Sequence, residues 1–196
     1  MPRWAWGLAA VALLFAVLLS TSPSLRAAIA DLDVMIGNIR LSVADRSPDS
    51  SDATIVEPEV MSLEAAREVV PFAFGIPTGI PDGLVMDEQV RVSDLDGGPF
   101  VEMQWARPGG GGFFFVVCQD PSSSSWLVGL DSYREIEIGG EPAVIVTGGW
   151  DAGSREWAWS EHTTLIWTVD GVQYRLSASA DNFSEADLIA IAESVR

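Results

Sequence analysis

The sequence predicts an α+β domain in which a mainly antiparallel sheet of about seven strands carries a short N-terminal helix and a C-terminal helix. Apolar and polar residues alternate through residues 164–179, and Asp170-Gly171 supplies the two-residue turn of a β-hairpin. From Phe183 onward the apolar residues instead recur every three or four positions, which is typical of an amphipathic helix. A hairpin followed by a helix that packs on it therefore forms the end of a domain expected over residues 61–196.

Composition limits the number of domains and the kinds of partner. A chain of 196 residues has room for one domain and a tether. The net charge of -17 would repel nucleic acids, which proteins bind through clustered cations, so we expect no nucleic-acid partner. Cys118 is the single cysteine, so the fold cannot depend on an intrachain disulfide.

The N-terminal segment is expected to meet a membrane. Trp4–Leu19 contains no charged residue and would form a helix about 24 Å long, close to the length of a bilayer span. Arg3 favours a cytoplasmic N-terminus. Residues 1–26 are thus predicted to be a signal-anchor or transmembrane helix, and the alternative is a signal peptide cleaved near Ala30, which would give a secreted protein. Both interpretations place the remaining chain outside the cytoplasm.

Residues 27–60 are predicted to form a juxtamembrane helix and a flexible acidic spacer. Ile29, Leu32, Ile36 and Ile39 are spaced three, four and three residues apart, which favours a helix over residues 27–41. That helix would either associate with itself or rest on the bilayer or the domain. The following residues, 42–60, are rich in Ser, Asp, Pro and Glu and bury too little apolar surface to fold.

Local signals place the elements of the domain. Ser62 is a candidate N-cap for a short helix that ends before Pro71, and Ser184 with Asp187 is a candidate capping box for the C-terminal helix. The expected strands before the last hairpin cover residues 84–92, 100–107, 112–119, 133–138 and 142–147, the last two joined at Gly139-Gly140. In the second strand Val101, Met103 and Trp105 alternate with polar residues, which indicates a sheet with one wet side.

Four pieces of the sequence carry a family resemblance. They are Phe72-x-x-Gly-Ile-Pro-x-x-Ile-Pro-Asp-Gly, the Trp105 strand ending in Arg107 and followed by Gln119, Tyr133-Arg-Glu-Ile-Glu-Ile-Gly-Gly-Glu, and Trp167-x-x-Asp-Gly-x-x-Tyr-x-Leu running into Leu188-x-x-Ile-Ala-Glu-Ser-Val. Over residues 61–196 the chain resembles the bacterial domain-of-unknown-function family numbered 4367.

The resemblance implies a place outside the membrane. Members of this family often follow one transmembrane helix, in proteins whose cytoplasmic part resembles zinc-binding anti-sigma factors. Only residues 1–3 precede the apolar run here, so no such cytoplasmic part is expected in this chain as given. The family has no agreed catalytic residues, so the resemblance assigns none.

The residues themselves point to no catalytic centre. His162 is the only histidine, it lies at a strand entrance, and the chain has no G-x-S-x-G motif. One His and one Cys cannot make a zinc site, and the turn at 94–98 lacks the later ligands of a calcium loop. Glu156 and Glu161 could be drawn as a glycosidase pair, but 28 acidic residues make some pair inevitable. We therefore expect no catalytic residue, no metal, no cofactor and no enzyme activity.

Tryptophan gives the strongest hint of a binding surface. Trp157-Ala158-Trp159 would place two indoles on one side of a strand, near Trp150 and Trp167. They could form a platform for glycans or for a partner segment. They could instead be core beneath the C-terminal helix, which is favoured because large aromatic side chains usually fill cores. The candidate binding residues are Trp126, Trp150, Trp157 and Trp159.

The function predicted from these observations is a membrane-anchored, non-catalytic module outside the cytoplasm that senses a ligand or binds a protein. The alternative is a secreted or periplasmic carrier that binds an apolar ligand or a glycan. A carrier of an apolar ligand would require a cavity lined by Phe113, Phe115 and Trp105.

Overall fold

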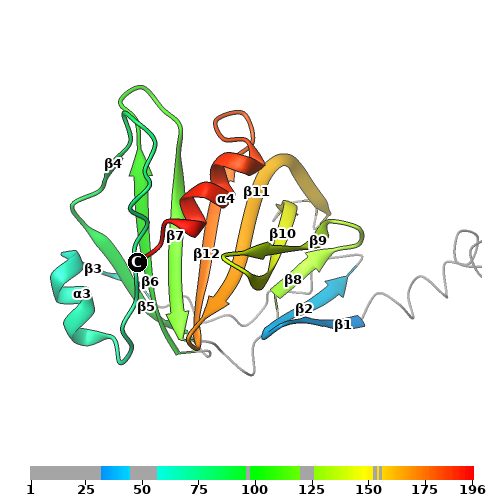
Figure 1. The fold of residues 1–196 in the computed structure, drawn as a ribbon, viewed down its shortest axis with the longest axis horizontal. Coiled ribbons are helices and arrows are strands. Elements are labelled where there is room, and N and C mark those ends of the chain that lie inside the picture. The colour runs from blue at the N-terminus through cyan, green and yellow to red at the C-terminus, as the bar shows by residue number, and fades with distance from the viewer. Residues whose placement is uncertain (1–31, 45–56, 96–97, 120–125, 152–153, 155) are drawn as a thin grey trace, which may run out of the picture.

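The computed structural model describes residues 32–44, 57–95, 98–119, 126–151, 154 and 156–196 (Figure 1). The expected membrane span at Trp4–Leu19, the alternative cleavage near Ala30 and most of the expected spacer lie outside these residues. Within the described ranges no helix is both long enough and apolar enough to cross a bilayer.

The described residues form a mostly β structure with two short helices, which is compatible with the predicted α+β class. The helices are α3 (Leu63–Val69) and α4 (Glu185–Glu193). The strands are β1 (Leu32–Ile36), β2 (Ile39–Ala44), β3 (Glu59–Met61), β4 (Val85–Met86), β5 (Val90–Leu95), β6 (Gly98–Ala106), β7 (Gly112–Gln119), β8 (Trp126–Gly129), β9 (Tyr133–Ile138), β10 (Glu141–Trp150), β11 (Trp157–Val169) and β12 (Val172–Ser179).

Two sheets contain these strands. A nine-stranded sheet has the order β3-β5-β6-β7-β12-β11-β10-β9, with β4 paired to β6, and its neighbours are antiparallel. A three-stranded sheet has the order β1-β2-β8, in which β2 and β8 run parallel. The prediction of a mainly antiparallel sheet is confirmed. The estimate of about seven strands is too low. The strand expected at residues 84–92 is divided into β4 and β5, β3 is too short to show alternation, and three further strands form the second sheet.

The two predicted hairpin turns occur where turn chemistry placed them. Gly139 and Gly140 have φ angles of 62° and 88°, and Asp170 and Gly171 have φ angles of 52° and 78°. Positive φ at both central residues is required by a type I′ turn, whose backbone twist matches that of the flanking strands. These turns fix the register of β9–β10 and of β11–β12, and therefore which side chains share a face.

One face of the large sheet is covered by α4 (Figure 1). Ser184 accepts a hydrogen bond from Asp187 N (3.2 Å) and Asp187 accepts one from Ser184 N (2.9 Å), so the predicted capping box is present. Leu188, Ile191 and Ala192 of α4 are buried against the apolar side of the sheet, together with Trp167. Ser62 likewise caps α3 by accepting a hydrogen bond from Ala65 N.

The helix predicted over residues 27–41 is wrong for its described part. Residues 32–44 form the β1–β2 hairpin, which turns at Gly37 with a φ of 56°. The spacing of Leu32, Ile36 and Ile39 fits a helix, but from Ile39 onward alternate residues, Leu41 and Val43, are buried. A period of two and a glycine with positive φ favour a hairpin over a helix.

The hairpin belongs to the folded domain. Ile39, Leu41 and Val43 pack with Val144, Val146 and Ile166, which lie on the face of the large sheet away from α4. Figure 1 places β1, β2 and β8 beside the end of the sheet that contains β9 and β10. The folded unit therefore includes residues 32–44, upstream of the start predicted at residue 61.

The aromatic residues required for an apolar carrier cavity fill the core. The Trp105 and Phe113 rings stack with centroids 5.0 Å apart, and Phe115 meets Trp105 edge to face at 6.1 Å. All three side chains are buried. They pack against one another, whereas such a carrier would need them to line an open cavity.

Candidate functional site

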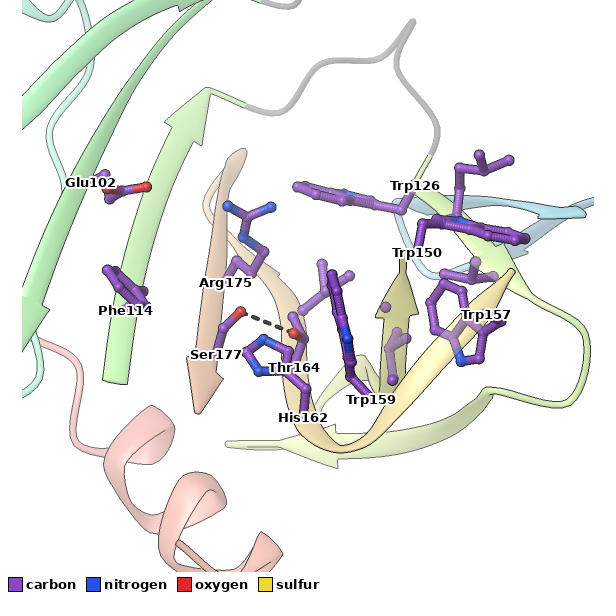
Figure 2. Close-up of a pocket in the computed structure, with 16 residues that line it drawn as sticks. Glu102, Phe114, Trp126, Trp150, Trp157, Trp159, His162, Thr164, Arg175 and Ser177 are labelled. Carbon is purple, nitrogen blue, oxygen red and sulfur yellow. Dashed lines mark hydrogen bonds between the residues drawn. The ribbon is translucent and has the colours of Figure 1, made fainter. Parts of the chain in front are cut away.

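The second face of the large sheet is only partly covered, and an open groove of about 580 Å³ lies where the cover ends. The three-stranded sheet covers β10 and part of β11, whereas the faces of β7 and β12 beside it carry Phe114, Arg175 and Ser177. Figure 2 shows indole rings along one side of this groove and Arg175 at its base. We call it the tryptophan groove and define it by Trp126, Trp150, Trp157, Trp159 and Arg175.

Three of the four indoles are fixed by hydrogen bonds from their ring nitrogens. Trp126 donates to Gln173 Oε1 (2.8 Å), Trp150 donates to Leu127 O (3.2 Å), and Trp157 donates to Thr147 O (2.9 Å). Trp150 and Trp157 also pack edge to face, with centroids 5.1 Å apart. The three indoles are partly buried, and these hydrogen bonds and ring contacts fix their orientations, so the rings form a rigid wall.

Trp159 differs from the other three because it is presented to solvent. Its side chain is 48% exposed, and its backbone has a φ of 55°, which is an outlier for a bulky residue. The irregularity comes from a register shift between Thr147 and Gly149 on β10, which leaves extra residues on β11. Strain of this kind costs about 1 to 3 kcal/mol and is retained when packing enforces it, often at functional sites.

Glycines on two strands make the space that Trp157 occupies. A Cβ at Gly129 would lie 2.5 Å from Trp157 Cγ, and a Cβ at Gly148, whose φ is 98°, would lie 2.7 Å from Ala158 O. The backbone at these two glycines therefore lies directly against the Trp157 ring. The ring also packs against the apolar cluster beneath the β1–β2 hairpin. Both Trp157 and Trp159 line the groove.

Arg175 provides the positive charge at the base of the groove. Its guanidinium carbon lies 4.8 Å from the centroid of the Trp126 ring. Among the described residues its Nε is buried without a hydrogen-bond partner. Burial lowers the pKa of Arg175, and the nearby Cys118 and Glu102 oppose that shift. The side chain nevertheless stays protonated near neutral pH, as arginine does in proteins.

Among the described residues that line the groove, one carries a carboxylate, and that carboxylate is already paired. Glu102 Oε1 accepts a hydrogen bond from Arg91 Nη1 at 2.7 Å. The register places Glu102 opposite Val116 and Val116 opposite Arg175, so the two charged residues are two strands, or about 10 Å, apart. Within the described ranges Arg175 makes no ion pair with an acidic side chain.

Polar groups from β11 and β12 complete the groove beside Arg175 (Figure 2). The hydroxyls of Thr164 and Ser177 hydrogen-bond to each other at 2.9 Å. His162 lines the same groove, and burial lowers its pKa, with Glu161 opposing and Arg175 reinforcing the shift. Its imidazole is therefore neutral near pH 7 and can both donate and accept a hydrogen bond.

The structure brings together all four tryptophans that the sequence singled out. Trp126, Trp150, Trp157 and Trp159 lie on the face away from α4, so the interpretation of Trp150, Trp157 and Trp159 as core beneath the C-terminal helix is wrong. It is right for Trp167, which is 1% exposed under α4. Trp126 and Trp157 do contribute part of their surface to the smaller core under the hairpin.

Sequence reasoning missed Arg175 and Gln173 as parts of this site. Both lie at alternate positions of β12, opposite the apolar residues Tyr174 and Leu176, so the period of two already placed them on the wet face. The missing information was that Trp126, 47 residues before Gln173, packs over that face.

The pieces that carry the family resemblance meet on the opposite face. Tyr174 Oη accepts a hydrogen bond from Gly75 N (3.2 Å), and Ile76 pairs with Arg196 through bonds of 3.0 and 3.2 Å. Ser194 Oγ accepts from Thr78 N and Gly79 N, at 3.2 and 2.8 Å. These contacts tie the proline-rich segment to the end of α4, so the shared pieces hold the fold together.

Comparison with curated proteins and with solved structures gives no match. A family model does match, over residues 75–195, and its description is Domain of unknown function (DUF4367). The matched range covers more than half of the chain and includes the β9–β10 and β11–β12 hairpins and the C-terminal helix. The chain belongs to the DUF4367 family.

Proposed function

We propose that this protein is a non-catalytic binding and sensing module whose tryptophan groove takes a segment of a saccharide chain. The observation that carries the proposal is the exposed Trp159 ring beside a wall of three fixed indoles. Fixed aromatic faces bind with little loss of side-chain entropy, because the rings are ordered before the ligand arrives.

The chemistry beside the rings favours a sugar over a purely apolar ligand. Thr164, Ser177 and His162 offer hydroxyl and imidazole groups within the groove, and these can hydrogen-bond to ligand hydroxyls. A few polar groups set among aromatic walls is the usual composition of a small-molecule site. The groove is open to solvent, whereas a carrier of an apolar ligand needs an enclosed cavity.

The place of action is proposed from the sequence. The apolar run Trp4–Leu19 would anchor the module in the membrane, and Arg3 would keep the N-terminus inside, so that the groove faces the cell envelope. The sensing role in an anti-sigma-like system, and any protein partner, are part of the same proposal. Fractionation of cells, followed by identification of the N-terminal peptide, tests the proposed membrane location. A soluble species beginning near Asp31 would instead indicate a secreted binder.

Binding is tested with a panel of microbial polysaccharides, read by tryptophan fluorescence and calorimetry. Trp159→Ala should lower the affinity at least about fivefold, since an aromatic contact contributes roughly 1 kcal/mol beyond its buried area. Its melting temperature should stay close to that of the parent. Val69→Ala is the matched control, because Val69 is an exposed apolar residue on α3. Equal binding by the parent and Trp159→Ala, or no binding to any polysaccharide, would overturn the proposal.

A further inference from the structure

Arg175 carries a positive charge that the described residues leave without an acidic partner. A buried charge is costly unless it is paired and hydrogen-bonded. Among the described residues the guanidinium forms no ion pair, and its Nε lacks a hydrogen-bond partner. The chain carries a net charge of -17, with 28 acidic residues, yet none of those described forms an ion pair with Arg175.

The guanidinium is also held in place by a built arrangement. Gln173 is 3% exposed, and its Oε1 accepts hydrogen bonds from Trp126 Nε1 (2.8 Å) and from the Cys118 thiol (3.9 Å). Gln173 thereby positions the Trp126 ring over the Arg175 guanidinium. Figure 2 shows the guanidinium between the Trp126 ring and the strand that carries Phe114. A fixed planar fork of donors matches the two oxygens of a carboxylate.

The rest of the groove agrees with a single negative charge in the ligand. Glu102 is paired with Arg91, so its interaction with Arg175 is a longer-range one that favours the protonated guanidinium without forming an ion pair with it. His162 is neutral near pH 7, so Arg175 is the one formal positive charge among the described residues lining the groove. One cation beside hydroxyl donors and aromatic faces fits a sugar ring that bears one carboxylate.

We propose that Arg175 is a subsite for the carboxylate of an acidic saccharide, such as a uronic acid residue, with Gln173 and Trp126 holding its guanidinium in position. This inference rests on the proposed function, because it names the ligand class of the same groove. It adds a requirement that stacking on tryptophan does not impose, namely a negative charge on the ligand.

The test compares a neutral oligosaccharide that carries one uronic acid residue with the methyl ester of that residue, because the two share their sugar rings and differ by one charge. The parent protein should bind the acid about 10- to 100-fold more tightly than the ester, the range expected for a charge-assisted hydrogen-bonded pair. Arg175→Gln should bind acid and ester equally, and Arg175→Lys should recover only part of the preference because it lacks the fork. The preference should also fall with added salt.

Arg134→Gln is the control, because it removes one positive charge from β9, where Arg134 pairs with Glu185 of α4. It should keep the preference for the acid. Equal binding of acid and ester by the parent would overturn the carboxylate subsite and leave the saccharide groove standing. Binding of neither form, together with a negative polysaccharide panel, would overturn both. If Arg175→Gln fails to fold, the comparison of acid and ester on the parent still decides the question.

Discussion

The two faces of the large sheet use the same residue type for opposite purposes. On the face under α4, Trp167 is 1% exposed and packs against Tyr174, with centroids 5.4 Å apart. On the other face, Trp159 is 48% exposed and borders an open groove. The difference lies in what covers the strands: a helix fills the first face, whereas the three-stranded sheet stops short on the second. Whether a tryptophan in a strand belongs to the core or to a binding surface thus depends on which element covers it, and that element can be remote in sequence.

The largest expected effect distinguishes the two faces directly. Trp167→Ala should lower the free energy of unfolding by about 3 to 5 kcal/mol, since it removes a large buried ring and leaves a cavity. Trp159→Ala should change it by less than about 1 kcal/mol, because its ring is half exposed. Urea unfolding of both variants measures the difference. Similar losses would show that the groove is a second core.

The next prediction asks whether the β1–β2 hairpin stabilises the groove face. Leu41 is fully buried between the sheets, so Leu41→Ala should cost about 2 to 5 kcal/mol. Met35→Ala is the control, because Met35 is 60% exposed on β1. Chemical denaturation followed by circular dichroism gives both values. If Leu41→Ala were as mild as the control, the hairpin would be an appendage, separate from the domain.

A smaller effect is expected where glycine makes room for Trp157. Gly129→Ala places a methyl group against the indole and should cost about 1 to 3 kcal/mol. Trp157→Ala removes the ring that the methyl group meets, so the double variant should lose less than the sum of the single losses. A double-mutant cycle by thermal unfolding measures this coupling. Additive losses would mean that the two residues do not press on each other.

The smallest effect is a pH dependence from His162 on the groove face. Burial lowers its pKa in the folded state below the usual value of about 6.5, so the unfolded chain binds the proton more readily. Stability should therefore decrease as the pH falls through about 6.5 and below, and increase toward neutral pH. His162→Gln should flatten this part of the profile in unfolding experiments between pH 7.5 and 5.5. An unchanged slope would assign the dependence to other groups.

The sequence predicted the face under α4 better than the groove face. Turns at Asp170-Gly171 and Gly139-Gly140 and the caps at Ser62 and Ser184 depend on local chemistry, and all of them occur. The covering of the second face depends on the parallel pairing of β2 with β8, between segments more than 80 residues apart, which no local period reveals. Residues 32–39 also matched a helical spacing by chance, so the hairpin that builds this face was misread.

The residues of the tryptophan groove were also predicted only where residue type was enough to identify them. The four tryptophans stood out by residue type. Arg175 did not, because it becomes part of the site only through its contact with Trp126, which belongs to the three-stranded sheet. Contacts between segments so far apart in sequence depend on tertiary packing, which residue propensities and hydrophobic periodicity do not predict.

The order of strands in the large sheet also bears on how the chain folds. β3 to β7 form one half and β9 to β12 the other, each from a continuous stretch of sequence, and the β7–β12 pair joins them. The hairpins within each half need only short loops, whereas the central seam must bring Gln119 to Val172. Non-local pairing of this kind slows folding, so the seam should form after the hairpins and limit the rate. Until it closes, β7 and β12 each present an unpaired edge, and the edge of β7 is rich in aromatic and β-branched residues.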